Sequence, residues 1–130
     1  MDEKNFQAQL DELTRANDYA GALQLIREAR QSKPAWLDGR EGELSREEIR
    51  FNGRTGDLLA LRSAARLYIN GDRLRSARII EIARELRAAG RAEEAVFLLK
   101  ELLAKDPSYA VGRKLLAEWS PPAPPAAKAP

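Results

Sequence analysis

A chain of 130 residues with 44% hydrophobic and 32% charged residues has the composition of one globular domain, and its 6% of aromatic residues favours a core of Leu, Ile and Ala in helices. The absence of cysteine and histidine excludes disulfides, thiolate nucleophiles and the commonest zinc ligands, so we expect neither a metal nor a cofactor. A net charge of +2 is too small to imply a nucleic-acid partner by itself.

The N-terminal part predicts two helices and a loop. Phe6, Leu10 and Leu13 stand at helical spacing in a helix over 3–16. Asp18 has the chemistry of an N-cap for the next helix, which runs over 19–31. Pro34 ends that helix, and the residues at 38–42 are typical of a turn.

The middle of the chain predicts a short helix followed by a buried one. Ser45 and Glu48 form a capping-box pattern, which predicts a helix start at Ser45 and a short helix that fades at 52–53. The turn around Gly56 leads to Asp57, the expected cap of a helix over 58–70. Because that helix is apolar over much of its circumference, we expect it to lie centrally in the fold.

Three further helices are predicted in the C-terminal part. Asp72 starts a long helix to about residue 89 and Gly90 ends it; the next helix covers 92–105. Pro107 suits the first position of a last helix over 107–119, with Val111 and Leu115 turned inward. Five of the last ten residues are prolines, so we expect a domain over 1–119 and a disordered tail or linker over 120–130.

An internal period appears between Gly56 and Gly90, which are 34 residues apart. In the unit over 76–109, small and apolar residues stand at packing positions around the Gly90 turn: Ala83, Leu86, Ala95, Leu99, Leu102 and the closing Pro107. The chain resembles the tetratricopeptide repeat family over 3–119, most clearly in this unit. In the middle unit, Leu61 and Tyr68 occupy positions where alanine is usual, and counting from Gly71 shifts its phase. The resemblance implies an all-α fold, a right-handed stack of about three antiparallel helix pairs plus a closing helix.

The resemblance also implies a concave side, lined by the first helix of each pair, that binds an extended peptide or a partner helix. The positions projected onto that side are mostly basic: Lys4, Gln7, Asp11, Arg15, Arg46, Arg50, Arg54, Arg84, Arg87 and Lys114. Arginine grips carboxylates through two parallel hydrogen bonds, so we expect a protein or acidic peptide as the partner. The alternative is that these arginines pair in i,i+4 fashion with the nearby Glu47, Glu81 and Glu85 on a solvated surface.

The expected function is therefore that of a non-catalytic adaptor or scaffold. A self-associating structural subunit is the competing interpretation. RNA binding by the arginines at 73, 75, 78, 84, 87 and 91 is less favoured, because they spread around the helix without an aromatic platform. Trp36 and Trp119 are candidates either for exposed anchors or for packing. No apolar run approaches the roughly 20 residues that span a bilayer, and polar residues follow Met1, so we expect a cytoplasmic protein without membrane insertion.

Overall fold

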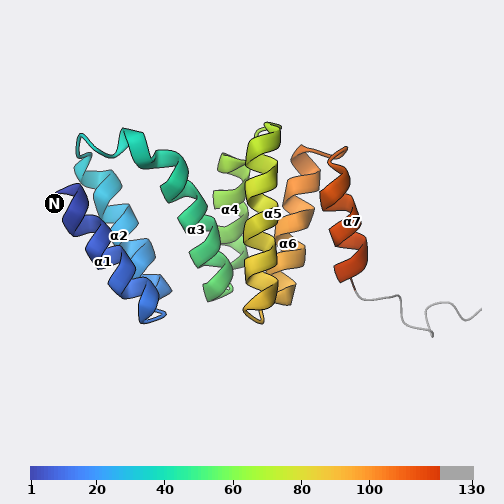
Figure 1. The fold of residues 1–130 in the computed structure, drawn as a ribbon, viewed down its shortest axis with the longest axis horizontal. Coiled ribbons are helices and arrows are strands. Elements are labelled where there is room, and N and C mark those ends of the chain that lie inside the picture. Colours follow the sequence, from blue (N-terminus) through green and yellow to red (C-terminus); the bar gives the residue numbers. More distant parts are fainter. Residues whose placement is uncertain (121–130) are drawn as a thin grey trace, which may run out of the picture.

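The computed structural model describes residues 1–120, and over that range the chain is all-α, with no strand (Figure 1). The helices are α1 (Glu3–Arg15), α2 (Tyr19–Ser32), α3 (Glu41–Thr55), α4 (Leu58–Tyr68), α5 (Arg73–Ala88), α6 (Ala92–Lys105) and α7 (Ala110–Trp119), with a short 3-10 turn, η1 (Asp38–Arg40), before α3. The predicted tail over 120–130 lies, apart from Ser120, outside the described residues.

The helices form an elongated row of two layers (Figure 1). Helices α1, α3, α5 and α7 lie in the nearer layer, and α2, α4 and α6 lie behind them with the opposite direction. Two pairs within a layer pack directly, α3 on α5 and α4 on α6. The pairs α1/α3, α2/α4 and α5/α7 lack such close backbone packing. Surface depressions lie between α2 and α4 and between α5 and α7.

The sharp corners after α1, α3 and α5 are confirmed at the residues that the sequence predicts. Asn17, Gly56 and Gly90 have φ angles of 58°, 78° and 83° in the left-handed region. Glycine takes this conformation without a steric penalty, and asparagine tolerates it better than most residues. Caps follow two of these corners, because the carboxylates of Asp18 and Asp57 accept the backbone N–H groups of the next helix, as predicted.

The predicted start and end of α3 are wrong. The helix begins at Glu41, directly after η1, so Ser45 lies inside it and forms no capping box. The first turn carries Glu41 and Glu43, whose charge favours a helix N-terminus. The helix also continues past Gly53 to Thr55. Gly53 is buried within it because a neighbouring helix approaches there, rather than because the backbone turns.

Helix α4 is not central, in contrast to the prediction. Leu61, Ala65 and Tyr68 are buried against α3 and α6, whereas Leu59 and Leu67 are 75% and 86% exposed. The helix packs closely on α3 and α6, and two of its leucines are left facing solvent.

Helix α7 begins three residues later than expected. Pro107 lies in a turn in which the Tyr109 N–H donates to the Asp106 carbonyl at 3.1 Å, and the helix starts at Ala110. Leu115 is buried as predicted, but Val111 is 43% exposed. Asp106, just before this turn, has a buried carboxylate that accepts a hydrogen bond from Ser76 of α5.

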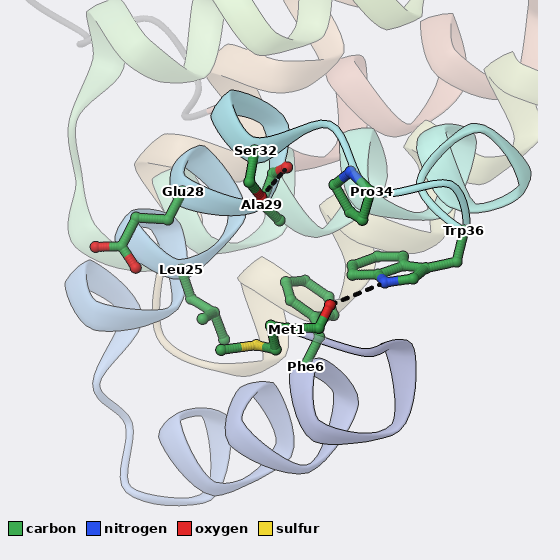
Figure 2. A pocket seen from close by; sticks show the side chains of 8 residues that line it. All are labelled: Met1, Phe6, Leu25, Glu28, Ala29, Ser32, Pro34 and Trp36. Atoms are coloured by element: carbon green, nitrogen blue, oxygen red, sulfur yellow. Dashed lines mark hydrogen bonds between the residues drawn. The ribbon is translucent and has the colours of Figure 1, made fainter.

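Two apolar clusters form the core, and α3 contributes to both. Phe51 belongs to the cluster of α1 and α2, while Ile49 belongs to the cluster of α4–α7. Figure 2 shows the top of the first cluster, where the Trp36 ring lies 5.0 Å from Phe6 and its Nε1 donates to the Met1 carbonyl at 3.3 Å. A cavity of about 70 Å³ remains there, enough for a few waters. Trp36 is therefore a packing residue.

Candidate partner-binding surfaces

The residues predicted to line one groove are spread along the nearer layer. Lys4, Gln7 and Arg15 lie on α1, Arg46, Arg50 and Arg54 on α3, Arg84 and Arg87 on α5, and Lys114 on α7. They do not surround a single depression. The structure brings some of them to a hollow at each end of the layer and engages others in ion pairs between the ends.

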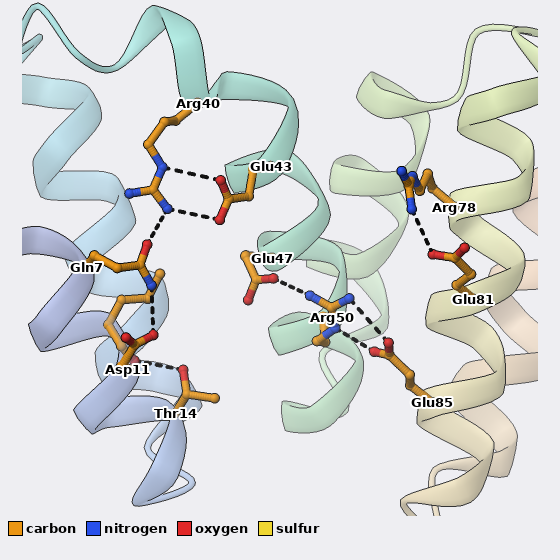
Figure 3. Close-up of polar contacts among 11 residues, drawn as sticks. Gln7, Asp11, Thr14, Arg40, Glu43, Glu47, Arg50, Arg78, Glu81 and Glu85 are labelled. Atoms are coloured by element: carbon orange, nitrogen blue, oxygen red, sulfur yellow. Dashed lines mark hydrogen bonds and ion pairs between the residues drawn. The ribbon is translucent and has the colours of Figure 1, made fainter. Parts of the chain in front are cut away.

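The middle of the layer is neutralised by ion pairs (Figure 3). Arg50 of α3 reaches Glu85 of α5, with 2.6 Å between Nε and Oε2, and also contacts Glu47. Burial lowers the pKa of Arg50, but hydrogen bonds and charge from these two glutamates outweigh it, so the net pKa shift is upward. Arg78 likewise pairs with Glu81 at 3.3 Å. The three glutamates of the alternative interpretation do pair with arginines, but through two i,i+3 contacts and one contact between helices rather than through i,i+4 pairs.

The first hollow, the α1/η1 hollow, measures about 610 Å³ and is lined by Glu3, Lys4, Gln7, Ala8, Asp11 and Arg40. Arg40 contacts the Gln7 amide and pairs with Glu43 at 2.9 Å (Figure 3). Its guanidinium also lies 5.6 Å from the Phe6 ring centre. The lining holds two acidic and two basic residues, so it offers no net charge to a ligand. Arg40 was not among the residues predicted for the groove, because the turn pattern at 38–42 gave it no helical face.

The second hollow, the α5/α7 hollow, measures about 640 Å³ and is lined by Arg84, Arg87, Ala88, Ala92, Leu115, Glu118 and Trp119. Within residues 1–120, neither Arg84 nor Arg87 has a carboxylate oxygen within 4.0 Å. The Arg87 guanidinium lies 5.0 Å from the centre of the half-buried Trp119 ring. The hollow therefore combines the unpaired guanidinium of Arg84, the guanidinium of Arg87 against the Trp119 ring, and an apolar floor.

The remaining predicted residues do not join either hollow. Arg15 donates to the Asp11 carbonyl at 3.3 Å, and the Arg54 guanidinium lies 5.3 Å from the Tyr19 ring centre. Lys114 is exposed and Arg46 is half-buried.

The arginine stripe considered for RNA is largely engaged within the fold. Five of its six members contact other side chains: Arg73 with Asp106, Arg75 with Tyr68, Arg78 with Glu81, Arg87 with Trp119 and Arg91 with Glu94. Cations held in this way are less available to phosphate groups.

A third depression, the α2/α4 groove, lies on the opposite layer and was not foreseen. It measures about 600 Å³, with α2 and α4 as its walls and α3 as its floor. Arg30 of α2 ties the wall to the floor through Glu41, at 2.5 Å, and Glu48. Burial by itself lowers the pKa of Arg30. Its hydrogen bonds to both glutamates raise the pKa by more than burial lowers it, so the net pKa lies above the ordinary arginine value.

The buried carboxylates join helices and are not grouped as a metal site. Glu101 of α6 accepts from Arg62 and Arg66 of α4, each at 3.1 Å. Within the described residues, no group of three or more possible metal ligands comes together. None of the helices in residues 1–120 combines the length and the apolar character that a membrane crossing requires.

Comparison with protein-family models, with curated proteins and with solved structures found no match to this chain. Its function is therefore inferred from the surfaces described above.

Proposed function

We propose that this chain is a non-catalytic adaptor or scaffold that binds an acidic peptide segment of a partner protein in the α5/α7 hollow. The observation that carries this proposal is the pair Arg84 and Arg87, which border the hollow without a carboxylate partner in residues 1–120. Arg50, which the sequence analysis placed in the same groove, is compensated by Glu47 and Glu85 and is left out of the proposed site.

The chemistry of the hollow suits a peptide that is acidic and also carries an apolar side chain. A guanidinium binds a carboxylate through two parallel hydrogen bonds, and Arg84 is exposed and free to do so. Trp119 and Leu115 offer an apolar surface for a neighbouring side chain, and tryptophan is enriched among residues that anchor interfaces. Glu118 on the α7 wall disfavours an acidic residue on that side, which orients the peptide.

We further propose that the helices form a tetratricopeptide-like right-handed stack. Support comes from the two alternating layers and from the left-handed corners at Asn17, Gly56 and Gly90, each of which follows a nearer-layer helix. In such arrays each helix pair buries its apolar face against its neighbours, and the extended surface that results serves binding.

Selection from a displayed library of short random linear peptides tests the binding site. We expect enrichment of Asp and Glu, and amide chemical-shift changes centred on Arg84, Ala88 and Leu115. Arg84→Glu should weaken binding at least tenfold, because it places like charge against the peptide. Arg113→Glu is the matched control, since Arg113 is also exposed but does not line the hollow. Equal loss in both variants, or shifts confined to another surface, would contradict the proposed site.

A further inference from the structure

We infer that the α2/α4 groove is a second docking site, which binds an extended segment of a partner protein with an acidic residue, small apolar residues and a basic residue along its length. The walls of this groove are α2 and α4, which lie in the layer opposite α5 and α7 (Figure 1), and the site does not depend on the α5/α7 hollow. With both sites occupied, the chain bridges two partners.

The open amide of Asn52 at the floor of the groove is the main evidence. Asn52 is only 9% exposed and lines the groove, and its side chain makes no hydrogen bond within residues 1–120. No fully buried side-chain nitrogen or oxygen in that range lacks a partner, so the amide of Asn52 reaches solvent through the groove. A carboxamide offers one acceptor and two donors. A ligand that covers it must therefore supply matching hydrogen-bonding groups.

Two serines add to the polar lining of the groove. Ser45 lies two helical turns before Asn52, on the same side of α3, and Ser63 lies on the α4 wall. Neither serine hydroxyl forms a side-chain hydrogen bond within the described residues. Beside them, α4 contributes an apolar wall of Ala60, Ala64 and Leu67, and its two alanines leave room for a peptide to approach closely. Leu23 adds an apolar side chain from α2.

An extended segment satisfies this lining better than a helix does. A helix has used its backbone N–H and C=O groups internally, so it would cover the three polar side chains without pairing them through its backbone. An extended chain keeps those groups free for Asn52, Ser45 and Ser63. Its side chains alternate in direction, so every second one faces the alanine wall, where small apolar residues fit.

Charge complementarity places two charged residues on the segment, close together along its length. Arg27 donates only to Gln24 and has no carboxylate within 4.0 Å in residues 1–120. One turn further along α2, Arg30 is shared by Glu41 and Glu48, so that cluster keeps one negative charge. An acidic peptide residue therefore belongs beside Arg27 and a basic one beside the glutamates. This pattern differs from the acidic peptide proposed for the α5/α7 hollow.

The test uses the full chain carrying Arg84→Glu as bait for a displayed random-peptide library, so that selected peptides do not depend on the α5/α7 hollow. We expect peptides that carry an acidic and a basic residue close together beside small apolar residues, and amide shifts centred on Asn52 and Ser63. Asn52→Ala should weaken their binding at least tenfold, whereas Asn5→Ala, an exposed asparagine on α1, should not. Ser63→Trp, at an exposed position, should block the groove and serves as a second variant if Asn52→Ala lowers the melting temperature.

Four results would overturn the inference. The first two are a selection without any enriched peptide and equal binding by the Asn52→Ala, Ser63→Trp and Asn5→Ala chains. The other two are amide shifts centred on another surface and sedimentation showing that a second copy of the chain covers the groove. A failed α5/α7 site gives a different result. Peptides selected with the wild-type chain would then bind the Arg84→Glu chain with unchanged affinity. The effect of Asn52→Ala on peptide binding does not depend on that result.

Discussion

The Ser76 hydroxyl donates a 2.9 Å hydrogen bond to Oδ2 of Asp106, and both residues are buried although they lie 30 positions apart. Arg73 approaches the other carboxylate oxygen at 3.3 Å. This contact joins the first turn of α5 to the corner between α6 and α7, and it accounts for an acidic residue that would otherwise be costly to bury.

Replacement of Asp106 tests that contact. We expect Asp106→Ala to lower the free energy of unfolding by about 1–3 kcal/mol, because the buried Ser76 hydroxyl loses its partner. Ser108→Ala, which removes an exposed hydroxyl contacted by Arg73, should change it by less than about 0.5 kcal/mol. Urea unfolding followed by circular dichroism measures both values. Similar values for the two variants would show that the Asp106 contact is not stabilising.

Two glycines of α3 should respond in opposite directions to alanine. A Cβ on Gly53 would lie 2.6 Å from Cδ1 of the fully buried Leu86, so Gly53→Ala should destabilise by about 1–3 kcal/mol through overpacking. A Cβ on Gly42 would have no neighbour closer than 3.8 Å, so Gly42→Ala should stabilise by about 0.5–1 kcal/mol through helix propensity. Thermal and urea unfolding measure both changes. A stabilising Gly53→Ala would show that Leu86 can move aside.

Glu47 should make the protein less stable as the pH rises. Burial raises the pKa of its carboxyl, and the nearby Arg50 only partly opposes this. The folded state therefore binds the proton more tightly than the unfolded state does. The stabilising contribution is complete below the ordinary glutamate pKa of about 4.3 and is lost as the pH rises through the raised value.

The variant Glu47→Gln lacks this titration. Its free energy of unfolding, minus that of the wild type, should increase as the pH rises through that window. Urea unfolding across the acidic range up to neutral pH measures the difference, with Glu12→Gln on α1 correcting for the lost charge. A flat or falling difference would contradict the raised pKa of Glu47.

The two faces of α4 should differ sharply in their tolerance of substitution. Leu61 is fully buried, so Leu61→Ala should cost about 2–5 kcal/mol. Leu67 is 86% exposed, so Leu67→Lys should change the free energy of unfolding by less than about 0.5 kcal/mol. Sedimentation at several concentrations belongs with this comparison, because a dimer that Leu67→Lys dissociates would favour the self-associating subunit instead.

Much of the fold could be predicted because its signals are local. The corners at Asn17, Gly56 and Gly90 depend on backbone conformations that few residue types accept, and the caps Asp18 and Asp57 act on their own helices. The start of α3 could not be predicted from such signals. Its capping-box pattern at Ser45 competes with η1, which leads the chain into helical geometry four residues earlier.

The candidate sites were less predictable, because they depend on contacts between distant residues. Helical periodicity places Arg50 and Arg84 on one layer, but only the packing of α3 on α5 brings Glu85 to Arg50. The exposure of Leu67 also has no local signal, since it results from α4 lacking a neighbour toward α2. Ser45 and Asn52, seven residues apart, do share one side of a helix, but that spacing has meaning only once α3 is known to extend through both.

The sharing of α3 between two apolar clusters has a mechanical consequence. The N-terminal hairpin, α1 and α2, packs on the rest of the molecule mainly through the contact of α2 with α3. The next two hairpins, α3/α4 and α5/α6, pack on each other in both layers, α3 on α5 and α4 on α6. Under a force applied to its two ends, the molecule should yield first at the seam beside Arg30 and Phe51, releasing α1 and α2 while the remaining helices stay folded.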